Sequence, residues 1–365
     1  MPDRPTPQPG ILDIAPYTPG RSDAPQGVTP VKLSANESPL GASPKALAAM
    51  RAAIEHPEIY PEGSSRLLRE ALAEVHGLDP ARIVCGFGSD DILHLLAQAY
   101  LGPGDEAVMS RHGFNVYPII TRAASAEIVM VPEADFRADV GALLAAVTPR
   151  TRVLFLANPN NPTGTYLSRA ELERLHAGLR PDILFVLDSA YAEYVTADDY
   201  GPGIDLVDRA ENVVMVRTFS KMGLAAERIG WMYGPAHIVD AVNRIRGPFN
   251  VSVAGQMGAA AAARDTEFTA RLRDYNARWR DWLTHSLASN AIRVIPSQGN
   301  FILALFPDPE TARAAFSALR DKGLIVREIQ GYGIPQGLRI SIGREEHMRG
   351  LVEVLQQFGA RGPAD

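Results

Sequence analysis

Residues 151–191, TRVLFLANPNNPTGTYLSRAELERLHAGLRPDILFVLDSAY, contain a strand, a helix and a second strand in succession. Positions 153–156 and 183–187 are apolar runs without alternation, a pattern typical of strands that are buried on both faces of a sheet. The intervening segment 169–178 has the mixed composition of an amphipathic helix. A helix that joins two such strands is the crossover unit of a parallel sheet.

The same alternation continues on both sides of this unit. A further helix is indicated at 90–100, and further apolar runs lie at 82–85, 107–110, 127–131 and 213–216. Together they predict an α/β fold in which helices cover both faces of a mostly parallel sheet.

After Gly247-Pro248 the pattern changes to a smaller α+β layer. The elements expected there are a long helical region at about 251–289, strands at 293–295, 301–305, 324–328 and 338–342, and helices at 309–322 and 345–358.

Residues 1–30 hold eight prolines, which remove so many N–H groups that neither a helix nor a central strand is expected there. We therefore expect an extended N-terminal arm at 1–38 that joins a small domain. The large domain is expected at 39–247 and the small C-terminal α+β domain at 248–365. Two globular domains agree with the length of 365 residues, since about 150 residues per domain is usual.

The composition argues against several classes of protein. A net charge of −6 disfavours nucleic acid as the main partner, and no apolar run is long enough to span a membrane. The single cysteine, Cys85, precludes an internal disulfide and is typical of a reducing compartment. No histidine pair has a metal-binding spacing, so no metal site is expected. The N-terminus lacks the apolar segment of a secretory signal, and we expect a cytoplasmic protein.

In an open parallel sheet, ligands bind beyond the carboxyl ends of the strands, so the residues that follow each apolar run are candidates. The run 82–85 is followed by Gly86-Phe-Gly-Ser-Asp-Asp91, a glycine turn that enters a helix and can present free N–H groups to a phosphate. It lacks the third glycine of a dinucleotide fingerprint, and it could also be a plain helix cap.

Three other strand ends carry polar groups, namely Asn158-Pro-Asn-Asn-Pro-Thr-Gly164, Asp188-Ser-Ala-Tyr191, and Arg217-Thr-Phe-Ser-Lys221 with Arg228. Taken singly, each segment has an ordinary structural explanation. The first could be a tight loop, the second could carry an ion-paired carboxylate, and the third could carry a solvated lysine. Taken together, they suit pyridoxal phosphate. The lysine can bind its aldehyde, the carboxylate can keep its ring nitrogen protonated, and the hydroxyls, the arginine and the helix N–H groups can hold its phosphate.

With these residues the chain resembles the fold-type I pyridoxal-phosphate aminotransferases, and within them the histidinol-phosphate aminotransferases. The resemblance covers nearly the whole chain. The Asn-Pro-Thr-Gly motif at 161–164 and the pair Ser220-Lys221 with Arg228 are specific for the superfamily. The Pro-Tyr-Thr-Pro-Gly segment at 16–20, and Gly-Tyr-Gly at 331–333 with Leu-Arg-Ile-Ser at 338–341, point to the histidinol-phosphate branch. Lys221 and Arg228 stand one residue closer than in many relatives, so a tighter loop is expected.

The resemblance implies a role for each matching residue. Lys221 would bind the cofactor and move a proton, and Asp188 would pair with the ring nitrogen. Asn161 and Tyr191 would bond the phenolic oxygen of the cofactor, and Phe114 would cover its ring. The phosphate would be held by the backbone of Ser89 and Asp90, and by Thr218, Ser220 and Arg228. Tyr60 would reach the phosphate of the neighbouring subunit, which implies a homodimer with shared active sites.

The resemblance also implies the substrates. The reaction would transfer an amino group from L-histidinol phosphate to 2-oxoglutarate, which gives imidazole-acetol phosphate and L-glutamate. Arg339 would clamp the substrate anion, Arg327 would be a second substrate arginine, and Tyr17 would close over the substrate phosphate.

Rival functions remain open at this point. An aromatic amino-acid aminotransferase has the same fold, and a phosphothreonine-type decarboxylase has the same cofactor motifs. A non-catalytic ligand-binding relative belongs to a different class of protein, although Lys221, Asp188 and Arg339 all speak for an enzyme. A dehydrogenase is disfavoured by the missing dinucleotide fingerprint.

Overall fold

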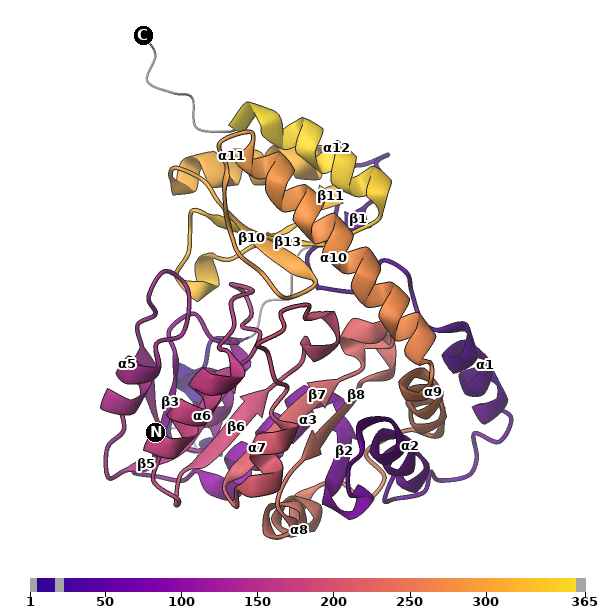
Figure 1. Cartoon of the computed structure of the whole chain (residues 1–365), viewed down its shortest axis with the longest axis vertical. Coiled ribbons are helices and arrows are strands. Elements are labelled where there is room, and N and C mark those ends of the chain that lie inside the picture. Colours follow the sequence, from indigo (N-terminus) through magenta and orange to yellow (C-terminus); the bar gives the residue numbers. More distant parts are fainter. Residues whose placement is uncertain (1–4, 17–22, 359–365) are drawn as a thin grey trace.

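The computed structural model describes residues 5–16 and 23–358. Its centre is a seven-stranded sheet in the order β2-β8-β7-β6-β5-β3-β4 (Figure 1). Six of these strands point the same way, and β8 is antiparallel to both of its neighbours. The expected mostly parallel sheet is therefore confirmed. The strands are β2 (Ile83–Phe87), β3 (Glu106–Ser110), β4 (Glu127–Val131), β5 (Thr151–Ala157), β6 (Leu184–Asp188), β7 (Val213–Thr218) and β8 (Ile229–Tyr233).

Helices cover both faces of this sheet because successive strand residues point to opposite sides. On one face, Val186 and Val214 belong to an apolar core formed with α3 (Gly88–Tyr100), α4 (Val116–Ala123) and α8 (Ala236–Ile245). On the other face, Phe185 and Met215 belong to a second core. Its helices are α1 (Pro44–Ala53), α2 (Arg66–His76), α5 (Val140–Ala145), α6 (Arg169–Gly178), α7 (Ile204–Arg209) and α9 (Val253–Arg264).

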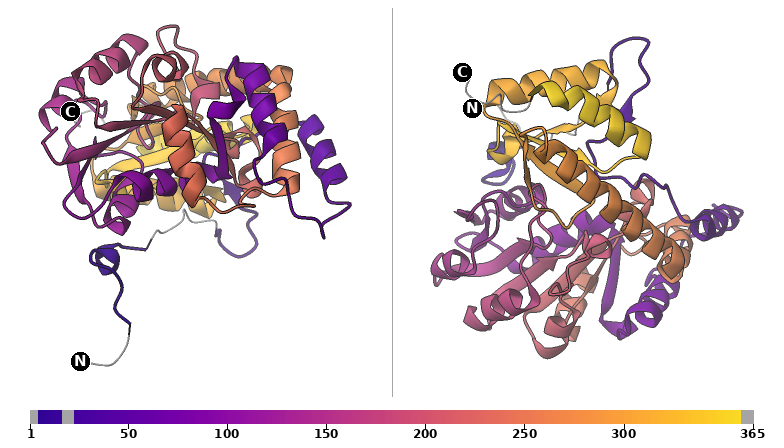
Figure 2. Two further views of the ribbon diagram at one scale, coloured as in Figure 1. Left: turned by 90° about the horizontal axis from the view of Figure 1, so that it is seen from below. Right: turned by 45° about the horizontal axis from the view of Figure 1, so that its top comes forward.

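A second, four-stranded sheet has the order β12-β13-β10-β9. Its strands are β9 (Arg293–Ile295), β10 (Phe301–Leu305), β12 (Arg327–Glu328) and β13 (Gly337–Ser341). One face packs against α10 (Thr266–Ala288), α11 (Pro309–Asp321) and α12 (Glu345–Leu355), which lie together in Figure 2 (right). In Figure 1, α10 runs from the side of the large sheet up to this second layer. The arm reaches the same layer, because β1 (Val31–Lys32) pairs in parallel with β11 (Leu324–Ile325).

The structure differs from the sequence-based expectations at four places. Strand β8 was not expected, since no helix separates it from Arg228 and a glycine interrupts its apolar run. The single strand expected at 324–328 is two short strands, because β11 pairs with the arm whereas β12 pairs with β13. The helical region at 251–289 breaks at Asp265, where α9 ends and α10 begins, and the last helix ends at Leu355 before a 3-10 turn, Gln356–Phe358.

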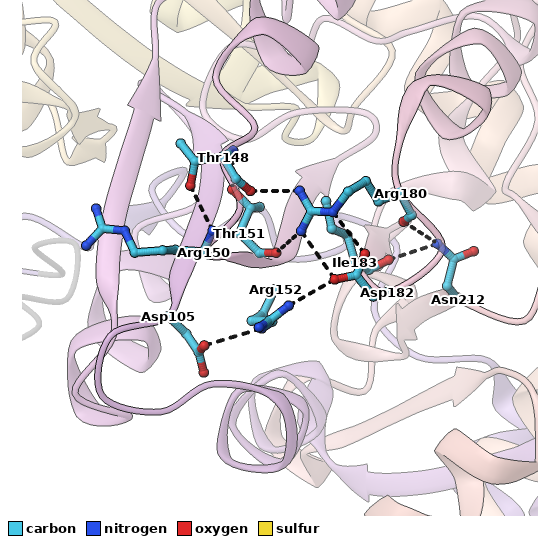
Figure 3. Close-up of polar contacts among 9 residues, drawn as sticks. All are labelled: Asp105, Thr148, Arg150, Thr151, Arg152, Arg180, Asp182, Ile183 and Asn212. Carbon is cyan, nitrogen blue, oxygen red and sulfur yellow. Dashed lines mark hydrogen bonds and ion pairs between the residues drawn. The ribbon is translucent and has the colours of Figure 1, made fainter.

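The amino ends of the central strands are held by a polar network (Figure 3). Arg180 donates to the carbonyl oxygens of Thr148 (2.7 Å) and Thr151 (3.1 Å), and its Nε donates to Asp182 (3.0 Å). Arg152 binds the second oxygen of Asp182 at 2.9 Å. This edge is therefore tied together by structural contacts, and the opposite edge of the sheet carries the pocket described next.

Candidate active site

A pocket of about 370 Å³ lies where the carboxyl ends of β5, β6 and β7 meet the arm and the four-stranded sheet. Among the described residues, every site residue expected from the sequence lines it, except Tyr60. The strand ends and loops of the large sheet contribute Ser89, Asp90, Phe114, Asn161, Asp188, Tyr191, Thr218, Ser220, Lys221 and Arg228, and the smaller sheet contributes Arg327 and Arg339.

One end of the pocket is built to hold an anion. Helix α3 begins here, and the first N–H groups of a helix have no intrahelical acceptor. Arg228 Nη1 donates to Ser220 Oγ (3.1 Å), and its Nη2 lies 3.4 Å from Asp90 Oδ2. Gly88 has a φ of +84°, and a Cβ at this position would lie 2.5 Å from Arg228 Nη2. Only glycine therefore lets the arginine approach the helix start. Arg228 itself has a φ of 56°, which closes the short loop from Lys221.

The Asp188 carboxylate, at the end of β6, is 4% exposed. It accepts hydrogen bonds from the Tyr117 hydroxyl (2.8 Å) and from the Ala190 N–H (3.2 Å). Burial nevertheless raises the pKa of Asp188 to about 6. A buried carboxylate is costly without a cation, so this position suits a ligand that carries a protonated nitrogen.

The Lys221 amine, just beyond β7, donates to the carbonyl oxygen of Ala35 at 3.3 Å. Burial, and next the nearby positive charge of Arg339, lower the pKa of Lys221 to about 8. A larger fraction of the amine is therefore unprotonated and nucleophilic at neutral pH than in an exposed lysine. The Lys221 Nζ also lies 5.8 Å from the centre of the Tyr191 ring.

Three buried hydrogen bonds order the substrate side of the pocket. Arg339, which is 6% exposed, donates to Asn161 Oδ1 (2.6 Å) and to the carbonyl oxygen of Ser34 (2.5 Å). Its Nε is buried and has no hydrogen-bond partner among the described residues. The Tyr191 hydroxyl accepts a hydrogen bond from Asn36 Nδ2 at 3.0 Å. The guanidinium thus keeps donor capacity for an anion.

These features fit pyridoxal phosphate as a cofactor. The glycine-lined helix start with Arg228 matches its phosphate, the buried Asp188 matches its ring nitrogen, and the low-pKa amine of Lys221 matches its aldehyde. Phe114 is half-buried, lines the pocket and contacts the Tyr117 ring edge-on, with 5.8 Å between ring centres.

The expected roles of two site residues, Tyr60 and Tyr17, are not tested by the structure. Tyr60 is 76% exposed and stacks on Phe249, with 4.6 Å between ring centres, outside this pocket. Its expected role concerns a neighbouring subunit and stays a prediction. Tyr17 lies outside the described residues, so its expected contact with substrate also stays a prediction.

Sequence reasoning missed Asn36 and Tyr117, which contact Tyr191 and Asp188. Asn36 stands in the segment Ser34-Ala-Asn-Glu37, and its φ of 56° marks a special conformation. Tyr117 lies inside α4, where an aromatic residue gives no signal apart from core packing.

The described part of the chain has neither a metal cluster nor a helix that could span a membrane. No group of three or more His, Cys, Asp or Glu side chains there could hold a metal ion. No helix within residues 5–16 and 23–358 is long and apolar enough to cross a membrane.

The chain is similar to known aminotransferases over nearly its whole length. The family model described as aminotransferase class I and II matches residues 28–355. A histidinol-phosphate aminotransferase of Nitrobacter hamburgensis is 54% identical over 362 residues, which cover 98% of this chain and 99% of the relative. One from Rhodopseudomonas palustris is 54% identical over 359 residues, with 97% and 98% covered. The crystal structure of histidinol-phosphate aminotransferase from Sinorhizobium meliloti in complex with pyridoxal-5'-phosphate has a TM-score of 0.85 and 30% identity, and the match covers 90% of this chain and 91% of that one.

Proposed function

The chain belongs to the class I and II aminotransferases and, within them, to the histidinol-phosphate aminotransferases, and we propose that it transfers the amino group of L-histidinol phosphate to 2-oxoglutarate. The products are imidazole-acetol phosphate and L-glutamate, in a step of histidine biosynthesis. The observation that carries this proposal is the pocket itself, in which Lys221, Asp188 and Arg339 lie together with the anion site at the start of α3. A reducing compartment, the cytoplasm, suits the free and buried Cys85.

Pyridoxal phosphate is the cofactor, and when bound it supplies an electron sink that stabilises negative charge on the substrate carbon. Asp188 would hold a proton on the ring nitrogen by its negative charge. Ser220, Arg228 and the first N–H groups of α3 would hold the phosphate. Tyr117 and the Ala190 N–H hold the Asp188 carboxylate in place.

Lys221 performs the proton transfer. Its Nζ lies in a buried site where the pKa is lowered to about 8, so it can accept a proton near neutral pH and return it later. This amine takes the proton from the substrate carbon that carries the amino group. The Tyr191 ring and the 34–37 segment surround Nζ and keep water from the reacting atoms.

Arg339 orients both substrates. Its forked guanidinium is fixed by Asn161 and by the Ser34 carbonyl oxygen, and its buried Nε remains able to donate. Glutamate offers a carboxylate and histidinol phosphate offers a phosphate, so one cation can serve both half-reactions. Arg327, on β12, lines the same side and adds a second positive charge.

A homodimer with shared active sites forms part of this proposal. The support is the exposed, stacked pair of Tyr60 and Phe249, together with the further exposed apolar side chains Ile59, Leu67 and Phe87. In a dimer, Tyr60 would complete the phosphate site of the other subunit. The test is subunit complementation, in which inactive Tyr60→Ala and Lys221→Ala proteins are mixed and refolded together. About a quarter of wild-type activity is expected from hybrid dimers, whereas no recovery would argue for self-contained subunits.

The substrate is tested by comparing kcat/KM for L-histidinol phosphate, phenylalanine and threonine phosphate. The proposal predicts the highest value for histidinol phosphate, because the pocket combines Arg339 with Arg327 for a phosphate-bearing substrate. A higher value for phenylalanine would favour an aromatic amino-acid aminotransferase. Release of carbon dioxide from threonine phosphate would favour a decarboxylase.

A further inference from the structure

A buried ion pair lies at the carboxyl end of β7, next to Thr218, a residue that lines the pocket. Arg217 Nη2 and Glu193 Oε1 are 2.6 Å apart, and their side chains are only 6% and 9% exposed. Arg217 is in β7, one residue before Thr218, and its guanidinium lies 5.3 Å from the centre of the Trp231 ring. His76 stacks on the same tryptophan with 5.6 Å between ring centres, and burial lowers its pKa to about 3, so it adds no charge.

The pair holds a short 3-10 turn, η3 (Ala192–Tyr194), against β7. Tyr191, which precedes the turn, faces the pocket and receives the Asn36 hydrogen bond. Tyr194, which ends the turn, donates its hydroxyl proton to the backbone carbonyl oxygen of Lys221. One turn therefore contacts both the phenol beside the reacting amine and the backbone that carries this amine, and Glu193 is its anchor.

The pair is poorly explained by stability alone. Glu193 Oε2 and Arg217 Nε are buried without a hydrogen-bond partner among the described residues. Buried ion pairs generally contribute little compared with apolar residues of the same volume, because both charges lose their hydration. This pair leaves two polar atoms unsatisfied, and it joins η3 to β7. Its role is therefore better explained by the position in which it holds η3 than by a gain in stability.

We propose that Glu193 is a positioning residue, whose ion pair with Arg217 fixes η3 and thereby places Tyr191 and Lys221 relative to Asp188. This inference rests on the proposed function of the pocket. Glu193 does not touch the substrate, so its effect on the reaction passes through Tyr191 and Lys221.

The test separates position from stability. Glu193→Gln keeps a hydrogen-bonding side chain but removes the charge. The double variant Glu193→Leu/Arg217→Met replaces the pair by apolar side chains and is expected to fold at least as stably as wild type. Glu106→Gln is the matched control, since Glu106 is also a buried carboxylate paired with an arginine, Arg150, but begins β3 at the opposite edge of the sheet.

Three quantities are measured for each protein with added pyridoxal phosphate: kcat, KM, and the pH midpoint at which the visible absorption band of the bound cofactor changes. Unfolding of the cofactor-free proteins is measured as well. The double variant is expected to lose about 10-fold or more in kcat with little change in KM. Its absorption midpoint is expected to move by about half a unit or more, because a displaced Tyr191 ring and Lys221 backbone change the surroundings of the titrating nitrogen. Glu193→Gln leaves the Arg217 charge buried without its partner, so it is expected to lose stability as well as kcat, whereas Glu106→Gln should leave kcat and the midpoint unchanged.

A double variant with wild-type stability, wild-type kcat and an unchanged midpoint would overturn the inference while the proposed function stands. The inference would also be overturned, with the proposed function intact, if Glu106→Gln changed kcat and the midpoint as much as the double variant does. Wild-type protein that takes up no pyridoxal phosphate would overturn the inference and the proposed function together.

Discussion

Replacing Asp188 by asparagine keeps the shape of the side chain but removes its charge, and the structure predicts opposite effects on stability and on activity. In the cofactor-free protein, burial raises the pKa of Asp188 from 3.8 to about 6. A rise of about two units corresponds to about 3 kcal/mol by which the ionised carboxylate destabilises the folded state.

The sign of the pH dependence follows from the direction of the shift. Because the pKa of Asp188 is higher in the folded than in the unfolded protein, the penalty is absent below about pH 4 and complete above about pH 7. With these pKa values the penalty grows by about 1.4 kcal/mol from about pH 5 to about pH 8. An asparagine at position 188 does not ionise, so its contribution to the free energy of unfolding does not depend on pH. One of its amide N–H groups lacks an acceptor, but that cost of about 1–3 kcal/mol is the same at both pH values.

The test is urea unfolding of cofactor-free wild type and Asp188→Asn, at one protein concentration and at both pH values. It gives the free energy of unfolding of each protein at each pH. The stability of Asp188→Asn relative to wild type should increase by about 1.4 kcal/mol at the higher pH. In the complete enzyme, the variant should bind cofactor but lose about 30- to 150-fold in kcat, because a charge-assisted contact of about 2–3 kcal/mol is missing. A relative stability that does not change with pH would refute the reasoning about burial. A nearly unchanged kcat would refute the role of the charge.

Other variants test the remaining roles. Lys221→Ala should abolish turnover, and borohydride should fix the cofactor of wild-type protein to Lys221 alone, which peptide mapping can establish because the chain has only three other lysines, Lys32, Lys45 and Lys322. Arg228→Ala should mainly weaken retention of the cofactor, seen as faster loss of colour on dialysis, whereas unchanged retention would argue against the phosphate role. Arg339→Ala should lower kcat/KM for glutamate and histidinol phosphate alike by about 30- to 1,000-fold, corresponding to about 2–4 kcal/mol. Tyr17→Phe should cost about 0.5–1.5 kcal/mol, mostly for the phosphorylated substrate, and an equal loss with glutamate would show that Tyr17 does not recognise the phosphate.

The fold was predictable where the sequence pattern is local. Parallel strands such as β6 and β7 are buried on both faces, so they appear as apolar runs, and their last residues mark the ligand edge of the sheet. Strand β8 was not predicted, because its residue pattern depends on a contact with a segment that is distant in the sequence. It contains Gly230, at which a Cβ would lie 2.2 Å from the backbone nitrogen of Ser89. The glycine that weakens the strand pattern is what allows β8 to approach the start of α3.

The site was predictable where a residue stands at a strand end, as Asp188 and Lys221 do. Its supporting contacts were not, because they join segments that are far apart in sequence. Asn36 and Tyr191 are 155 positions apart, and Arg339 and Asn161 are 178 apart. The buried pair of Glu193 with Arg217 likewise has no local signal, since each residue alone could be a surface charge.

The most direct test of the account is the amount of L-glutamate formed when purified protein is incubated with L-histidinol phosphate, 2-oxoglutarate and pyridoxal phosphate. We expect one glutamate for each histidinol phosphate consumed, and none with Lys221→Ala, because the amino group moves only through the pocket that holds Lys221, Asp188 and Arg339. Binding of histidinol phosphate without formation of glutamate would contradict the account and would favour a non-catalytic ligand-binding protein.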